Sequence, residues 1–320
     1  MKPVFLILES QNIHEEALAV YRRLGDVEFF QPESGRDHSL ATVLVVRLGY
    51  RLDEPFLQRF PHLRLLVSPT TGLNHVDLEA CRARGITVLS LKGETEFLQS
   101  ITATADLAFA LLLALVRRIH AGVHSVVRDG LWDRDRFRGR ELQSMVLGLV
   151  GFGRLGRIMA RYASAFGMRV LACDPFIDPR VFPDHAVTPC DLETLFRQSD
   201  AVSLHADYRQ ENEKMITRAH FCLLPFGSYF INTARGELVD ETALLEALET
   251  GRLAGAAVDV LDHELEGGPL LDRPLVRYAR SHDHVLITPH LGGCTFESMH
   301  KTELFMARRV EAWLQQGETS

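Results

Sequence analysis

The chain has 320 residues, 46% of them hydrophobic and 24% charged, which is enough for about two packed domains and excludes a mainly disordered protein. Its formal net charge of −7 argues against a protein that binds nucleic acid or an anionic membrane through bulk positive charge. The five cysteines are scattered and form no CxxC pair, which predicts a reduced, cytoplasmic chain without a structural zinc or other metal. The longest apolar run, Leu107–Val116, is too short to span a bilayer, so we expect no membrane insertion.

Strand-like and helix-like segments alternate from the N-terminus. Apolar runs predict strands at 3–8, 41–47, 63–69 and 86–90. Helical periodicity predicts helices between them at 14–25, 52–60 and 76–85. A long helix is expected at about 97–120. Bulky residues surround most of its middle, so it should be buried between layers or in a subunit interface.

A second alternating series follows a polar loop at 128–140. Its predicted strands are 146–151, 169–174, 201–206, 228–234, 255–260 and 284–290. Its predicted helices are 154–167, 191–199 and 241–251, and the stretch 262–283 is predicted to be a loop with one helical turn. Short strands alternating with helices indicate parallel sheets, so the two series predict two α/β domains.

The motif Gly151-Phe152-Gly153-Arg154-Leu155-Gly156 lies between a predicted strand and a predicted helix, which is the context that a dinucleotide fingerprint requires. Gly151 permits the tight turn, Gly153 lets a pyrophosphate approach the backbone, and Gly156 lets helix and strand pack closely. The helix N-terminus then offers N–H groups and a positive dipole end to phosphate.

Asp174 ends the next predicted strand, 18 residues after Gly156. A carboxylate there can accept hydrogen bonds from the ribose hydroxyls of adenosine and would repel a 2′-phosphate. The sequence therefore predicts NAD as the cofactor rather than NADP.

Unusual polar residues follow three later strands: Arg235, Asp259 with Glu264, and His290. Ligands of open α/β sheets bind beyond the carboxyl ends of strands, so these side chains could converge on one ligand. Histidine suits the proton transfer that accompanies hydride transfer from an alcohol, and a neighbouring glutamate would orient it and favour imidazolium. Arg235 could hold a substrate carboxylate bidentately. Taken singly, a buried Arg–Glu pair or a histidine after a strand is more often structural.

With these residues in place, the chain resembles the D-isomer-specific 2-hydroxyacid dehydrogenases from about Val43 to Val310. The resemblance is carried by the stretches LGLVGFGRLGRIMA, FINTARGELVDETALLEAL, GRLAGAAVDV and ITPHLGGCTFES. It implies an NAD-dependent oxidoreductase that interconverts a D-2-hydroxyacid and its 2-oxoacid.

The resemblance also implies a role for each matching residue. Arg235 binds the substrate carboxylate and carbonyl, His290 is the acid/base, and Glu264 pairs with His290. Arg154 and Leu155 lie along the pyrophosphate, and Asp259 lies at the carboxamide side of the nicotinamide. The remaining cofactor groove is lined by Thr104, His205, Thr233, Ala234 and Gly293. Backbone N–H groups of the turn that contains Thr71 and Gly72 are expected to meet the substrate carboxylate.

The implied architecture consists of two doubly wound parallel-sheet domains. A Rossmann cofactor domain, residues 100–290, is inserted into a flavodoxin-like substrate domain, residues 1–99 and 291–320. The long first helix of the cofactor domain commonly supports a dimer in this family, so we expect a homodimer.

Substrate choice stays open at this point. Arg47 follows the strand at 41–47 and either meets an anionic group of the substrate or forms a salt bridge. Two other functions are considered. One is a formate- or phosphite-type dehydrogenase of the same fold, against which Glu264 argues because formate enzymes typically carry glutamine there. The other is an NAD-sensing corepressor that binds peptides.

Overall fold

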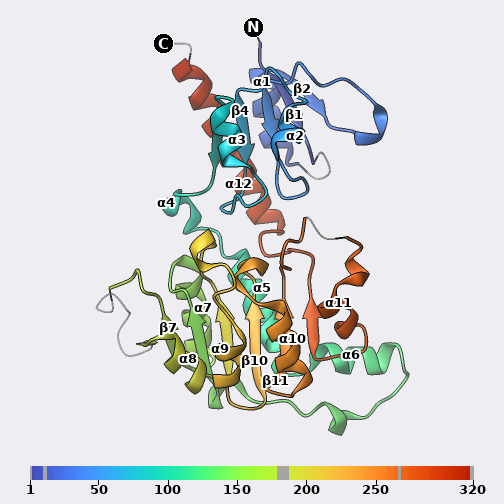
Figure 1. The fold of residues 1–320 in the computed structure, drawn as a ribbon, viewed down its shortest axis with the longest axis vertical. Helices are drawn as coiled ribbons and strands as arrows, with labels where there is room; N and C mark the ends of the chain where they lie inside the picture. Colours follow the sequence, from blue (N-terminus) through green and yellow to red (C-terminus); the bar gives the residue numbers. More distant parts are fainter. Residues whose placement is uncertain (1, 10–12, 179–186, 266–267, 318–320) are drawn as a thin grey trace. The chain divides into compact units, whose positions relative to one another are not determined.

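The computed structural model describes residues 2–9, 13–178, 187–265 and 268–317. The chain forms two compact units, one made of Met1–Ile101 with Thr295–Ser320 and the other of Thr102–Cys294 (Figure 1). The sequence predicted the two crossings after residues 99 and 290, and the structure has them slightly later. The last three residues of the predicted substrate domain, 318–320, lie outside the described residues.

The first unit contains a five-stranded sheet in the order β2-β1-β3-β4-β5, with every neighbouring pair parallel. Its strands are β1 (Val4–Ile7), β2 (Asp26–Phe29), β3 (Val43–Val45), β4 (Leu65–Ser68) and β5 (Thr87–Ser90). This is the strand order of flavodoxin-like folds, so the predicted fold of this unit is confirmed.

Helices cover both faces of this sheet. They are α1 (Glu15–Leu24), η1 (Pro32–Ser34), α2 (Glu54–Leu57), α3 (Leu78–Ala83), α4 (Thr95–Leu98) and α12 (Phe296–Gly317). Helix α12, from the far end of the sequence, packs beside α1 and closes one apolar layer around Phe5, Tyr21 and Val310. A second layer around Leu44 and Phe60 fills the other face.

The second unit contains a seven-stranded parallel sheet in the order β12-β11-β10-β9-β6-β7-β8. Its strands are β6 (Val146–Val150), β7 (Arg169–Cys173), β8 (Val187–Pro189), β9 (Ala201–Leu204), β10 (Ser228–Asn232), β11 (Leu253–Val258) and β12 (Val285–Ile287). Read from β8, this is the Rossmann order 3-2-1-4-5-6 with one added strand, as predicted. The strand order reverses between β6 and β9, where ligands of such sheets bind.

The helical segments of the second unit lie on both faces of its sheet and in the connections between its strands. They are α5 (Ala103–Val116), α6 (Ile119–Val127), η2 (Arg134–Phe137), η3 (Leu142–Ser144), α7 (Arg154–Ala165), α8 (Leu192–Gln198), η5 (Gln210–Asn212), α9 (Arg218–Leu223), η6 (Gly236–Leu238), α10 (Glu241–Glu249), η7 (Leu270–Asp272) and α11 (Pro274–Ala279). Separate apolar layers around Leu112 and Phe230 fill the two faces.

The prediction of a single long helix at about 97–120 is wrong. The structure has α4, α5 and α6 in its place, and Arg118 adopts a left-handed backbone conformation (φ 51°) that ends α5 and starts α6. The stretch Thr95–Val116 is long and apolar enough to cross a membrane by composition, and half of it is buried. Because α5 packs against α7, β10 and β11, this stretch is explained as a core helix.

Candidate active site

The turn between β6 and α7 carries Gly151 and Gly153, and Gly156 lies in the first turn of α7. Gly151 has φ +93°, and a Cβ there would lie 2.7 Å from the backbone of His205 and Ala206, so only glycine fits. A Cβ on Gly156 would lie 2.3 Å from the carbonyl oxygen of Gly151, so helix α7 meets the end of β6 through this contact. A Cβ on Gly153 would meet no atom within 4 Å. Gly153 therefore leaves open space beside the helix terminus.

Helix α7 begins at this open space. Its N-cap Gly153 offers no side-chain cap, so the N–H groups of its first turn can serve a bound anion. Arg154 is half-buried at the same terminus, and burial lowers the pKa of its guanidinium, which still carries its charge near neutral pH. Leu155 packs partly against the apolar layer. The open space at Gly153 and the N–H groups of the first turn of α7 fit the pyrophosphate of a dinucleotide.

Asp174 lies at the end of β7, beside the glycine turn. One carboxylate oxygen accepts the N–H of Phe152 at 2.9 Å and the other accepts the N–H of Phe176 at 3.0 Å. Each carboxylate oxygen can accept about two donors, so both keep a lone pair for another hydroxyl. This geometry suits the two ribose hydroxyls assigned to Asp174 from the sequence.

Two predicted groove residues, at the ends of β9 and β10, carry buried polar atoms without a partner in the described chain. His205 contacts Ser203 Oγ through Nε2 at 2.9 Å, while its Nδ1 has no hydrogen-bond partner. Burial lowers the pKa of His205 to about 4, so the ring is neutral near pH 7. The hydroxyl oxygen of Thr233 is likewise buried and without a partner. Unsatisfied buried polar atoms are costly, so these two atoms suit a ligand that supplies the missing hydrogen bonds.

The turn that carries Arg235 follows β10. The Asn232 side chain fixes it by donating to the carbonyl oxygen of Arg235 at 2.9 Å and accepting the N–H of Ala234 at 3.0 Å. Arg235 Nη1 donates to the carbonyl oxygen of Ala234 at 2.6 Å. Burial lowers the pKa of Arg235, while Glu264 and other nearby carboxylates favour its charged form. The result is a half-buried cation at the carboxyl edge of the sheet.

Glu264 and His290 meet at this edge. His290 follows β12 with left-handed backbone (φ 53°), and its Nδ1 lies 2.5 Å from Glu264 Oε1. Burial raises the pKa of Glu264, but the hydrogen bond and charge of His290 and the charge of Arg235 outweigh burial and bring the pKa below its ordinary value. Glu264 is therefore ionised near neutral pH. With Nδ1 held by Glu264, Nε2 is the nitrogen of His290 left to exchange a proton with a substrate.

Asp259 clamps the loop that carries His290. Its carboxylate is 1% exposed and accepts the Thr288 hydroxyl at 2.5 Å and the N–H groups of Leu291 and Gly292 at 2.7 Å each. The N–H of His290 also donates to the Asp259 carbonyl oxygen at 2.9 Å. A contact between Asp259 and the nicotinamide stays a prediction. The sequence analysis did not predict that the Asp259 carboxylate holds the His290 loop.

Thr104 and Gly293 lie by the same loop. A Cβ on Gly292 would come within 3.1 Å of the Thr104 methyl group, so α5 supports the loop closely. A Cβ on Gly293 would meet no atom within 4 Å. The loop therefore presents open space on the side of Gly293, as the predicted groove requires.

The predicted substrate residues of the first unit follow β3 and β4. Arg47 Nη2 lies 3.3 Å from Glu303 Oε1 of α12, so the salt bridge considered from the sequence is present and lies within this unit. Thr71 is exposed, and the carbonyl oxygen of Gly72 accepts the Thr70 hydroxyl at 2.9 Å. Contacts of Arg47, Thr71 and Gly72 with a substrate stay predictions.

Sequence reasoning also missed Glu9, whose carboxylate accepts the N–H groups of Arg47 at 2.5 Å, Leu48 at 2.9 Å and Gly49 at 2.6 Å. This shapes the loop after β3. No local pattern signals this contact, because Glu9 and the loop are far apart in the sequence. Asn232 could have been found, since asparagine before a turn commonly bonds the backbone ahead of it.

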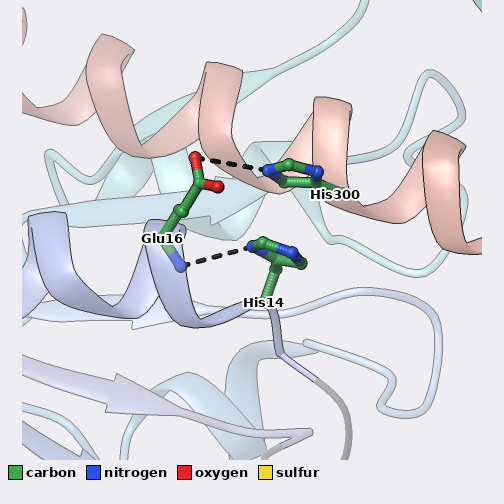
Figure 2. A group of neighbouring side chains, drawn as sticks. All are labelled: His14, Glu16 and His300. Atoms are coloured by element: carbon green, nitrogen blue, oxygen red, sulfur yellow. Dashed lines mark hydrogen bonds and ion pairs between the residues drawn. The ribbon is translucent and has the colours of Figure 1, made fainter.

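Within the described residues, one group of three side chains has the composition of a metal site: His14, Glu16 and His300 (Figure 2). The two imidazole rings are stacked, with centroids 3.5 Å apart and planes inclined by 15°. An imidazole binds metal through a lone pair in its ring plane, so parallel stacked rings do not point at a common ion. His300 Nε2 lies 3.4 Å from Glu16 Oε2, and the group links α1 to α12.

The fold and this site together define a dinucleotide-binding protein with a His–Glu pair at the carboxyl edge of its Rossmann sheet. Comparison with known proteins agrees. Residues 109–292 match the family model for the NAD binding domain of D-isomer specific 2-hydroxyacid dehydrogenases. The chain belongs to this family, and its cofactor is NAD.

Individual relatives cover nearly the whole chain. Glyoxylate reductase of Thermococcus litoralis is 30% identical over 98% of this chain and 94% of that protein. D-3-phosphoglycerate dehydrogenase of Methanocaldococcus jannaschii is 31% identical over 95% of this chain, which spans 56% of that longer protein. Among solved structures, D-lactate dehydrogenase from Aquifex aeolicus, complexed with NAD and lactic acid, has a TM-score of 0.83 and 27% identity, covering 98% of this chain and 96% of that one.

Proposed function

We propose that this protein is an NAD-dependent oxidoreductase that interconverts a D-2-hydroxyacid and its 2-oxoacid by hydride transfer. The observation that carries the proposal is the 2.5 Å contact between His290 Nδ1 and Glu264 Oε1 beside the half-buried Arg235. A histidine held in left-handed backbone by a clamped loop, with one nitrogen left for a ligand, suits catalysis better than a structural ion pair.

When bound, NAD supplies or accepts the hydride at C2 of the substrate. In the reductive direction, Arg235 binds the carboxylate of the 2-oxoacid and polarises the adjacent carbonyl. His290 donates its Nε2 proton to the carbonyl oxygen, so a hydroxyl forms and the imidazole becomes neutral. Glu264 remains ionised and holds the ring by Nδ1 throughout. The oxidative direction reverses these steps, with neutral His290 accepting the hydroxyl proton.

The test is NADH oxidation with 2-oxoacids that differ in size, charge and phosphate. His290→Ala should remove turnover and leave NADH binding nearly intact, because His290 acts on the substrate proton. His62→Ala, an exposed histidine of the first unit, is the matched control. Normal turnover in His290→Ala, or no turnover of any 2-oxoacid by the unaltered protein, would contradict the proposal. Peptide binding without turnover would instead favour the corepressor function.

We also propose a homodimer formed through the second unit. Support comes from exposed apolar side chains on α6 and the segment after it: Ile119, Val123, Val126, Val127, Leu131 and Trp132. Val127 is 74% and Trp132 90% exposed, and a surface with several such side chains is typical of a protein interface. Val127→Glu should yield monomers in light-scattering chromatography, whereas Leu40→Glu, on an exposed side chain of the first unit, should not.

A cytoplasmic location is part of the same proposal. It is supported by the five cysteines, all of which are free thiols, as expected in a reducing compartment. Fractionation of cells that express the tagged chain tests it.

A further inference from the structure

The backbone of the turn that carries Glu264 is hydrogen-bonded by two side chains, from the starts of α10 and α11. Arg273, at the start of α11, donates through Nη1 to the carbonyl oxygen of Asp262 at 2.6 Å and through Nη2 to that of His263 at 2.9 Å. Glu241, at the start of α10, accepts the N–H of Asp262 at 2.7 Å. Both the N–H and the carbonyl groups of the backbone just before Glu264 are therefore held by side chains.

This turn needs such support, because His263 has left-handed backbone (φ 47°). Residues other than glycine adopt that conformation only where their surroundings impose it. The two carbonyl bonds of Arg273 flank His263, and a planar guanidinium makes both with one rigid group. The bidentate contact of Arg273 thus stabilises the strained conformation of His263.

The turn is also pressed against the one that carries Arg235. A Cβ on Gly236 would lie 2.1 Å from the carbonyl carbon of Leu261 and 2.3 Å from the N of Asp262. A shift of the Glu264 turn would therefore disturb its fit against the Arg235 turn as well as its contact with His290. A residue that fixes the Glu264 turn therefore affects the positions of Glu264, His290 and Arg235 together.

Glu241 and Arg273 assist each other electrostatically. Burial raises the pKa of Glu241, while the N–H of Asp262 and the positive charge of Arg273 oppose this rise. The charged groups that face Glu264 on the ligand side are His290 and Arg235. The bonds described for Arg273 go to main-chain carbonyl oxygens, so it acts on Glu264 through the backbone.

We propose that Arg273 is a positioning residue for the reaction: with Glu241 it fixes the 261–264 turn so that Glu264 meets Nδ1 of His290. This inference rests on the proposed function, because it assigns Arg273 a part in the same site. It requires no contact of Arg273 with substrate or cofactor.

The kinetic experiment compares Arg273→Met, Arg273→Lys and the control Arg277→Met, an exposed arginine on α11. Misplacement of a catalytic group by about 1 Å can cost about a hundredfold in rate, so we expect kcat of Arg273→Met for 2-oxoacid reduction to fall roughly tenfold to a hundredfold. KM for NADH should stay the same. Lysine restores the charge with a single donor direction and should rescue partly, and Arg277→Met should match the unaltered protein.

A second measurement does not depend on turnover. Titration of the protein labelled with 13C at glutamate carboxyls, with the Glu264 signal identified by its loss in Glu264→Gln, should show a higher pKa for Glu264 in Arg273→Met. An unchanged Glu264 titration together with unchanged kcat would overturn the inference. If the unaltered protein reduces no 2-oxoacid, the proposed function fails, and this titration still decides whether Arg273 positions Glu264. If Arg273→Met does not fold, Arg273→Lys and Glu241→Gln give the same comparison.

Discussion

Replacement of Asp259 by asparagine tests the clamp on the His290 loop. Both carboxylate oxygens are in use: Oδ1 accepts the Thr288 hydroxyl and the Leu291 N–H, and Oδ2 accepts the Gly292 N–H at 2.7 Å. An asparagine can keep the first two bonds with its carbonyl oxygen, but its NH₂ group then faces the N–H of Gly292. One bond to a charged acceptor, typically about 1.5–3 kcal/mol, is lost at a site that is 1% exposed.

If that loss falls on the active arrangement of the loop, kcat/KM should drop roughly tenfold to a hundredfold, at about 1.4 kcal/mol for each factor of ten. The assay is NADH oxidation with the best 2-oxoacid, run beside thermal unfolding. Asp129→Asn, an exposed aspartate of the same unit, is the control. Activity of Asp259→Asn within twofold of the unaltered protein would refute the clamp.

Two further predictions concern the cofactor groove. Asp174→Ser should weaken NADH binding and relieve discrimination against NADPH, because the carboxylate that meets the ribose hydroxyls is gone; an unchanged ratio of the two dissociation constants would exclude this role. His205 is buried and its pKa falls from 6.5 to about 4, so the unfolded chain binds a proton at this position that the folded chain does not. The free energy of unfolding therefore decreases as the pH falls from 6.5 toward 4, by about 3 kcal/mol in all, and His205 has no such effect above pH 6.5. His205→Gln should flatten the dependence of unfolding free energy on pH across that window, and an equal slope in both proteins would show that His205 does not cause it.

The sequence was sufficient for the central strands of both sheets, because these strands are buried on both faces and appear as continuous apolar runs. It found two of the four edge strands, β5 and β12, and missed the other two, β2 (Asp26–Phe29) and β8 (Val187–Pro189). Their sequences, DVEF and VTP, are short or partly polar, since an edge strand has less surface to bury. The break between α5 and α6 was missed for a different reason: Arg118 carries no sign of left-handed backbone in its residue type.

The site shows the same division. Arg235, Glu264 and His290 could be named because each follows a strand at the carboxyl edge of one sheet, and the topology brings such positions together. The contacts that hold them could not be named. Asp259 reaches Thr288 across 29 residues, and Arg273 reaches the backbone of Asp262 across 11. Contacts of this kind depend on how loops pack, and no local pattern records loop packing.

Total charge is a poor guide to the ligands of this site. The chain carries a net charge of −7, yet the pyrophosphate of NAD and the carboxylate of the proposed 2-oxoacid substrate are both anions. A single charge a few ångströms from a ligand in a partly buried site outweighs many surface charges, because salt largely screens charges that are more than about 10 Å away. The N-terminus of α7 with Arg154 and the half-buried Arg235 are two such local positive centres. The carboxylate of Glu264 lies near Arg235 and contacts His290, and the charges of Glu264 and Arg235 favour each other's ionised form.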